Sequence, residues 1–271
     1  MLKLYSESSL RDFFTEIYQI LRDTDPKLTE IWCEIPKISF FEGMKKIELI
    51  HFIENFNFIS LRKGNYIFYI VIEKILFIID CIKFLKYDIA HLSEILDYSG
   101  FEALINEILS KNNYHTTTNF RFSESSDLKS SKSQKRYEID VIGIYSNYIL
   151  IIDAKQWKRK DSYGPISKAA NLQYARVKAL KRNPDSFLKL ISLLIGEDPS
   201  IKKRLPFTLI PIMVTLEDNS TKLNENQIPL VSIYEFNAFL QELLYNLHYF
   251  KSVQIGKLVR QNKLDDFHIK G

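Results

Sequence analysis

The sequence of 271 residues predicts an α/β domain that follows a smaller, mixed and mostly helical N-terminal unit. Helical and strand-like apolar patterns alternate along the second part of the chain. Two neighbouring segments there, Val141–Ile144 and Ile149–Ile152, are apolar on both faces, as in strands buried inside a layered domain. A tight turn at Ser146-Asn147 separates them and predicts a hairpin. We therefore divide the chain into residues 1–94 and 95–271.

The first 94 residues begin with a helical spacing of apolar side chains and continue with a predicted hairpin that turns at residues 62–65. An apolar helix or strand follows. No group of residues in this segment indicates a chemistry, so its role stays open. The mixed pattern predicts a unit that is mostly helical.

The second unit is predicted to begin with a helix in which apolar residues recur at i, i+3, i+4, i+7 and i+8 from Phe101. A Ser- and Lys-rich stretch without apolar period predicts a basic loop at residues 123–136. Pro165 stands where a first helical residue is favoured. The remaining elements are predicted as strands at 114–122, 138–145, 148–156, 207–215 and 230–233, and helices at 165–182 and 234–247.

The composition is typical of a globular protein, with 46% hydrophobic and 26% charged residues. A net charge of +4 permits a nucleic-acid partner without requiring one. Cys33 and Cys81 lie in apolar surroundings and are predicted to be buried thiols. The chain shows no stretch long and apolar enough for a membrane span or a signal peptide, so we expect a cytoplasmic protein without a membrane partner.

Four polar side chains meet in the predicted hairpin. If Ser146-Asn147 is a two-residue loop, Asp140 lies opposite Asp153, and Glu138 lies opposite Lys155. Side chains alternate along a strand, so all four would emerge on one face. Facing carboxylates repel each other, and a divalent cation such as magnesium or manganese would relieve that repulsion. In the alternative interpretation, Glu138–Lys155 is an ordinary ion pair and the aspartates are solvated.

The segments Tyr137-Glu-Ile-Asp140 and Ile149-Leu-Ile-Ile-Asp-Ala-Lys-Gln-Trp157 resemble the signature of the PD-(D/E)XK, or restriction-endonuclease-like, nuclease superfamily. The predicted helix, three strands, helix and strand resemble the αβββαβ core of that family, a mixed central sheet flanked by helices. The resemblance covers roughly residues 95–235. It is nearest in pattern to the Mrr-type and archaeal junction-resolvase-like members.

The resemblance implies a role for each matching residue. Asp140 and Asp153 would bind Mg²⁺ or Mn²⁺, and the backbone carbonyl of Ala154 is a candidate third ligand. Lys155 would position the attacking water or stabilise the transition state. Glu102 matches a glutamate on the first helix of such relatives, where it would complete the metal site. It also fits a capping box with Ser99, and both roles stay open.

A second group of residues is predicted to contact nucleic acid. Lys158, Arg159, Lys135 and Arg136 are basic residues expected near this end of the sheet, where they could contact phosphates. A solvated lysine-rich surface is the alternative. Gln173 falls within the buried stripe of its helix, where it could hydrogen-bond the site carboxylates or a phosphate, or satisfy a backbone group.

Together these features predict a metal-dependent hydrolase that cleaves phosphodiester bonds in DNA through a metal-activated water. The preference for DNA comes from the resemblance, and RNA stays open. Many such relatives act as dimers, so a homodimer is an open alternative to a monomer. The competing interpretation is a catalytically silent module with the same fold that binds nucleic acid or a protein partner.

Overall fold

The computed structural model describes residues 5–85, 92, 95–124, 135–156, 163–197, 203–216 and 222–257. The chain forms two compact units. The first contains residues 1–108 and 156–158, and the second contains residues 109–155 and 159–271. Helix α5 (Tyr98–Lys111) contributes residues to both units.

The first unit combines helices with a three-stranded antiparallel sheet in the order β1-β3-β2. Its mixed character agrees with the prediction, whereas its first strand was not predicted. The loop between the second and third strands covers residues 64–67, two residues after the predicted turn. Its elements are α1 (Glu7–Arg22), β1 (Glu30–Glu34), η2 (Ile35–Lys37), η3 (Ser39–Phe41), α2 (Lys46–Ile53), β2 (Ile59–Lys63), β3 (Phe68–Glu73) and α3 (Lys74–Leu85).

Phenylalanine side chains form the core of the first unit. Phe13 from α1 packs edge-on against Phe52 from α2, with ring centroids 4.9 Å apart. Phe58 meets Phe77 of α3 in a similar geometry at 5.1 Å. Such edge-to-face pairs add to the stabilisation from burial alone. The helices are therefore held to one another and to the sheet by aromatic contacts.

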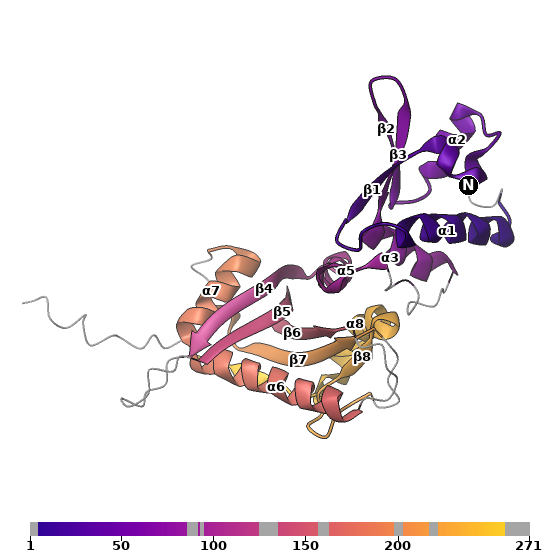
Figure 1. Cartoon of the computed structure of the whole chain (residues 1–271). Coiled ribbons are helices and arrows are strands. Elements are labelled where there is room, and N and C mark those ends of the chain that lie inside the picture. The colour runs from indigo at the N-terminus through magenta and orange to yellow at the C-terminus, as the bar shows by residue number, and fades with distance from the viewer. Residues whose placement is uncertain are drawn as a thin grey trace, which may run out of the picture. The chain divides into compact units, whose positions relative to one another are not determined.

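The second unit contains a mixed six-stranded sheet in which five strands follow the order β4-β5-β6-β7-β8 (Figure 1). The sixth strand, β9, pairs with β7. The first three strands are antiparallel, and β6, β7 and β8 are parallel. The predicted α/β architecture is thereby confirmed. The strands are β4 (His115–Glu124), β5 (Lys135–Tyr145), β6 (Tyr148–Lys155), β7 (Phe207–Thr215), β8 (Leu230–Ser232) and β9 (Val253–Ile255).

Helices flank this sheet. Helix α6 (Tyr163–Arg182) packs on β6 and β7, and α7 (Pro184–Ile195) packs on β4. Helix α8 (Ile233–Asn246) contacts β7 and β8, and η6 (Leu247–Tyr249) follows it. The sequence did not predict α7, which Pro184 opens and Asn183 caps. Across the described ranges, none of the helices is long and apolar enough to span a membrane.

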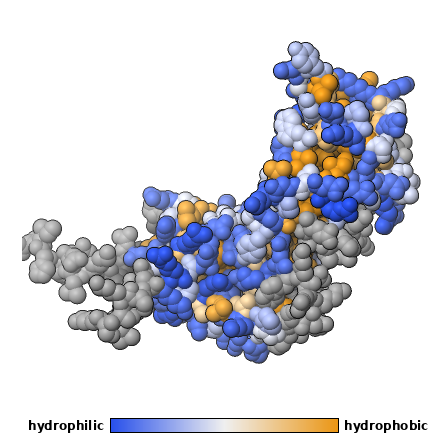
Figure 2. All heavy atoms as spheres, viewed as in Figure 1, coloured by the Kyte–Doolittle hydropathy of each residue, from blue (hydrophilic) through white to orange (hydrophobic). Residues whose placement is uncertain are grey.

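The apolar core between the sheet and the helices α6 and α7 is continuous. Strand β6 is buried on both faces from Ile149 to Ala154, as predicted. The surface of the molecule mixes hydrophilic and hydrophobic residues (Figure 2). The principal members of this core are Phe120, Phe122, Ile139, Ile142, Ile144, Ile149, Ile151, Val177, Leu180, Phe187, Leu190, Ile191, Phe207 and Leu209.

The turn between β5 and β6 has the predicted two-residue length. Ser146 adopts a positive φ of 56°, which tight hairpin loops require. The Asn147 side chain donates a hydrogen bond to Pro206 O at 3.2 Å, and Thr208 N donates to Asn147 O at 2.9 Å. These contacts join the hairpin to the start of β7. They set the register between β6 and its parallel neighbour.

Both thiols are predicted to resist modification in the folded protein. Cys33 and Cys81 are buried and unpaired with each other, as the sequence predicts. Burial raises the pKa of Cys33 to about 11 and raises that of Cys81 further, so almost no reactive thiolate exists near neutral pH. We expect neither thiol to react with a disulfide reagent such as DTNB until the chain is denatured. Rapid reaction of the native protein would contradict this burial.

Candidate active site

The β5–β6 hairpin has the register that the sequence predicts. Its ladder runs from Tyr145↔Tyr148 to Val141↔Ile152. The next residues along the two strands are Asp140 and Asp153. Beyond the last pair, Ala154 N donates a hydrogen bond to Asp140 Oδ2 at 2.8 Å. The Asp140 carboxylate thus bonds directly to the backbone of β6 where the ladder ends.

Strand β5 is irregular at this point. Ile139 and Ile142 both belong to the core under α6 and α7, although residues three apart point to opposite faces of a regular strand. On β4, Asn119 has a positive φ of 54°, and it lies between the residues that pair with Val141 and Ile139. The strand therefore changes face beside Asp140. Such local irregularities re-aim side chains and are frequent near active sites.

The Lys155 ammonium lies close to both aspartates. Its Nζ lies 3.2 Å from Asp153 Oδ2 and 3.9 Å from Asp140 Oδ2. The Asp153 side chain is 1% exposed, whereas the Lys155 side chain is 25% exposed. The Lys155 ammonium is therefore accessible from the surface, whereas the Asp153 carboxylate is not. The three residues predicted from the sequence lie in one cluster.

Arg176 of α6 is a fourth member of this cluster, and the sequence analysis missed it. Its Nη1 donates to Asp153 Oδ1 at 2.7 Å and to Gln173 Oε1 at 2.8 Å. Arg176 lies three residues after Gln173, at the margin of the buried stripe of α6. That spacing was the available signal, since residues i and i+3 are neighbours on a helix.

Gln173 is fully buried, as its place in the helical stripe predicts. Its oxygen accepts from Arg176, so its link to the aspartates is indirect. Its Nε2 atom is buried and has no hydrogen-bond partner in the part of the chain that the structure describes. An unmatched buried donor is costly, so this amide is a sign that the site is built for more than packing.

The two aspartates are electrically balanced by Lys155 and Arg176. A divalent cation was the predicted means of relieving the repulsion between the facing carboxylates, and these two cations of the chain also relieve it. No set of three or more histidine, cysteine, aspartate and glutamate side chains is placed to hold a metal within the described ranges. The pair of carboxylates that converges on Lys155 Nζ nevertheless suits Mg²⁺ in type and number, because this ion commonly uses one or two carboxylates.

Glu138 has a different partner from the one predicted. Its carboxylate accepts from Arg121 Nη2 at 2.8 Å, across the β4–β5 ladder. The prediction assumed a regular ladder that would continue to Lys155, whereas the β5–β6 pairing ends at Val141↔Ile152. Glu138 is therefore part of an exposed cross-strand ion pair on the outer strands.

Glu102 is buried and belongs to the first unit, whereas the three clustered residues belong to the second. The capping-box interpretation is wrong, because α5 begins at Tyr98 and the Asp97 side chain accepts from the first turn in the position of the cap. Asp97 Oδ1 accepts from Gly100 N at 2.7 Å and from the Ser99 hydroxyl at 2.8 Å. The role of Glu102 in metal binding stays a prediction.

The structure describes two of the four basic residues that were predicted to contact nucleic acid. Lys135 and Arg136 are exposed at the start of β5, and Lys135 Nζ lies 5.1 Å from the centroid of the Tyr137 ring. Lys158 and Arg159 lie outside the described residues. Of the basic residues named from the sequence, the structure therefore describes only the two on β5.

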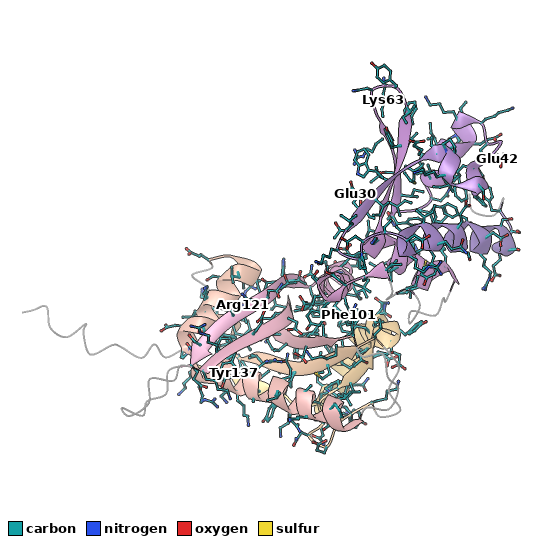
Figure 3. The ribbon with its side chains drawn as sticks, viewed as in Figure 1. Glu30, Glu42, Lys63, Phe101, Arg121 and Tyr137 are labelled. Carbon is teal, nitrogen blue, oxygen red and sulfur yellow. The ribbon has the colours of Figure 1, made fainter. Side chains whose placement is uncertain are left out.

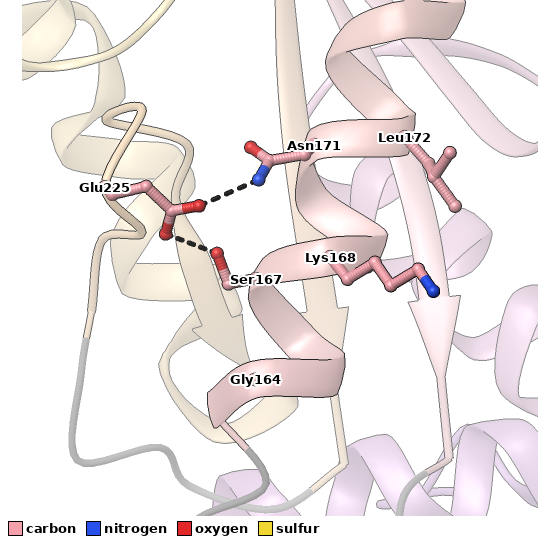
Figure 4. Close-up of a pocket in the computed structure, with 6 residues that line it drawn as sticks. All are labelled: Gly164, Ser167, Lys168, Asn171, Leu172 and Glu225. Atoms are coloured by element: carbon pink, nitrogen blue, oxygen red, sulfur yellow. Dashed lines mark hydrogen bonds between the residues drawn. The ribbon is translucent and has the colours of Figure 1, made fainter.

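Helix α6 is held in place by the segment around Glu225. Ser167 and Asn171 both donate to the Glu225 carboxylate and point toward it, whereas Lys168 points away (Figure 4). Asn226 Nδ2 donates to Asn171 Oδ1 at 2.7 Å. A cavity of about 600 Å³ opens here, and it contains none of the clustered residues. We interpret this network as an anchor that positions Arg176 further along the helix.

Comparisons with known proteins do not assign a family. No protein-family model and no curated protein matches the sequence. The crystal structure of protein VC1899 from Vibrio cholerae aligns with 90% of this chain at 13% identity and a TM-score of 0.34. The chain spans about half of that protein, 53% of its length.

The Arg176–Asp153 contact is predicted to stabilise the fold. Arg176→Met leaves a buried carboxylate with one cation fewer, and we expect a loss of about 3 kcal/mol in the free energy of unfolding. Urea denaturation measures this. In an Asp153→Asn background the same substitution should cost at least about 1 kcal/mol less. Equal costs in the two backgrounds would show that the pair is not energetically coupled.

Proposed function

We propose that this protein is a metal-dependent nuclease that hydrolyses phosphodiester bonds in DNA. The observation that carries the proposal is the convergence of Asp140, Asp153 and Lys155 at the end of a buried hairpin. The order α5, β4, β5, β6, α6, β7 is also the order expected for the nuclease core that the sequence resembles. The additional helix α7 would be an insertion in that core.

Asp140 and Asp153 would hold a Mg²⁺ or Mn²⁺ ion, with the carbonyl of Ala154 as a further ligand. Such an ion, when bound, neutralises charge on the scissile phosphate and makes an attacking water more acidic. Both oxygens of Asp153 contact cations of the chain. Metal binding would therefore require Lys155 or Arg176 to break its contact with at least one of these oxygens.

Lys155 is the cation placed to act on a substrate. Its side chain is partly exposed, and it lies beside both carboxylates. Turned toward a phosphate, it would donate a charge-assisted hydrogen bond and stabilise the negative charge that develops during hydrolysis. Arg176 is less suited to this step, because its contacts hold Asp153 and Gln173 in position.

A catalytically silent binding module is the second candidate. The observation that favours it is the charge balance of the cluster, in which Arg176 and Lys155 compensate Asp153 without a metal. In such a protein the four residues would stabilise the end of the hairpin. The two candidates differ in their response to divalent ions and in the effect of removing Lys155.

The first test is cleavage of plasmid, linear and single-stranded DNA with Mg²⁺ or Mn²⁺. Asp140→Asn and Lys155→Ala are each expected to lower the rate by more than about 100-fold, because the first removes a proposed metal ligand and the second removes positive charge that would stabilise the transition state. Lys168→Ala is a matched control, since Lys168 is an exposed lysine of the same unit that points away from the Glu225 network (Figure 4). Full cleavage by Lys155→Ala would exclude this active site.

A second test uses metal binding without substrate. An ion that binds only the folded state raises the melting temperature as its concentration rises. We expect Mn²⁺ to stabilise the native protein but not Asp140→Asn. Arg176→Met should bind Mn²⁺ more tightly, since it removes a cation that competes for Asp153. An equal thermal response in native and Asp140→Asn proteins would support the silent module.

A further inference from the structure

A second concave feature lies on the outer end of the β4–β5 pair. It is a cavity of about 450 Å³ in the second unit, the same unit that holds Asp140 and Asp153. Figure 3 labels Arg121 and Tyr137, which belong to it. The residues that line it are Arg121, Phe122, Ser123, Arg136, Tyr137 and Glu138.

Strand alternation places four of the six lining residues on one face, and Phe122 and Tyr137 on the other. Arg121 pairs with Glu138 and Ser123 pairs with Arg136 across the ladder, so these four side chains share the outward face. Phe120, Phe122 and Ile139 belong to the core on the opposite side. The polar face is therefore backed by a rigid, packed layer.

Positive charge predominates in this cavity. Arg121 is 73% exposed on its side chain and Arg136 is also exposed. Glu138 is the one carboxylate among the lining residues, and it accepts from Arg121. The nearby Glu124 contacts Arg182 and the Tyr137 hydroxyl on the other side. Toward the start of β4, the exposed residues His115, Thr118 and Asn119 add no acidic group.

We propose that this cavity binds the phosphodiester backbone of DNA, with Arg121 and Arg136 as the phosphate ligands. The proposal rests on the proposed function, and it identifies where the substrate would be held outside the reaction centre. Arg136 precedes Asp140 by four residues on β5, and the strand changes face beside Asp140.

Glu138 would compete with a DNA phosphate for Arg121. Its ion pair with Arg121 is exposed, and such pairs contribute little to stability, so a phosphate can replace the carboxylate at small cost. Glu138 also holds the guanidinium in place in the absence of DNA. The carboxylate is thus a competitor of the ligand, and its removal should strengthen binding.

The test is the affinity of a fluorescein-labelled single-stranded and duplex oligodeoxynucleotide in EDTA, measured by anisotropy over a range of salt concentrations. Arg121→Ala and Arg136→Ala are each expected to weaken binding about tenfold, the effect of one charge-assisted contact. The slope of log K against log salt should fall by about 0.9 per lost contact on duplex and about 0.7 on single strands. Of single-stranded and duplex DNA, the form that loses more affinity in these variants is the one that the cavity binds.

Arg11→Ala is the matched control. Arg11 forms an exposed ion pair with Glu7 at 2.8 Å, the same distance as Arg121 to Glu138, but it lies on α1. It should leave affinity and salt slope unchanged. A loss equal to that of Arg121→Ala would overturn the proposal, because general surface charge would then explain the binding.

Glu138→Gln is expected to strengthen DNA binding, in contrast to the two arginine variants. It removes the competing charge and keeps the shape, so we expect affinity to rise about threefold or more, within the range of one charge-assisted contact. Unchanged binding in Glu138→Gln and in both arginine variants would overturn the proposal. Because binding is measured without metal, this failure is distinct from failure of the nuclease. If these variants cleave DNA and bind it with unchanged affinity, the proposed role of the cavity is wrong and the proposed nuclease activity stands.

Discussion

The candidate site depends on the burial of Asp153. Its carboxylate is 1% exposed at the end of a strand that is covered on both faces. A charge in such surroundings is very costly unless it is paired and hydrogen-bonded. Arg176 supplies the hydrogen bond to one oxygen and Lys155 supplies positive charge beside the other. The hydrogen bond from α6 and the neutrality of the site both meet this requirement.

The sequence alone predicted the hairpin and its cluster because these features are local. The turn at Ser146 and Asn147 and the β-branched runs beside it define the register, and the register brings Asp140 next to Asp153. Lys155 then follows from alternation along β6. Most strand positions in the second unit were predicted for the same reason, since each is a short apolar run between turn residues.

Features that depend on tertiary packing were not predicted. Arg176 reaches Asp153 only because α6 crosses the end of β6, which no local pattern shows. Glu138 bonds Arg121 because β5 changes face beside Asn119, where the ladder departs from regular alternation. The helix α5 is capped by Asp97 and not by Ser99, a shift of two residues that local preference does not decide. Each miss concerns a partner that is distant in sequence or a departure from ideal geometry.

Under the proposed function, the charge balance of the cluster couples the binding of the metal to the binding of DNA. A divalent ion alone must displace Lys155 or Arg176 from Asp153, and it meets their repulsion. A phosphate alone is attracted by those cations but repelled by two carboxylates. If the two bound together, the phosphate would give Lys155 a new partner, and Asp140 and Asp153 would be the residues that hold the metal. Binding of metal and DNA should therefore be cooperative, with Lys155 as the residue that exchanges between them.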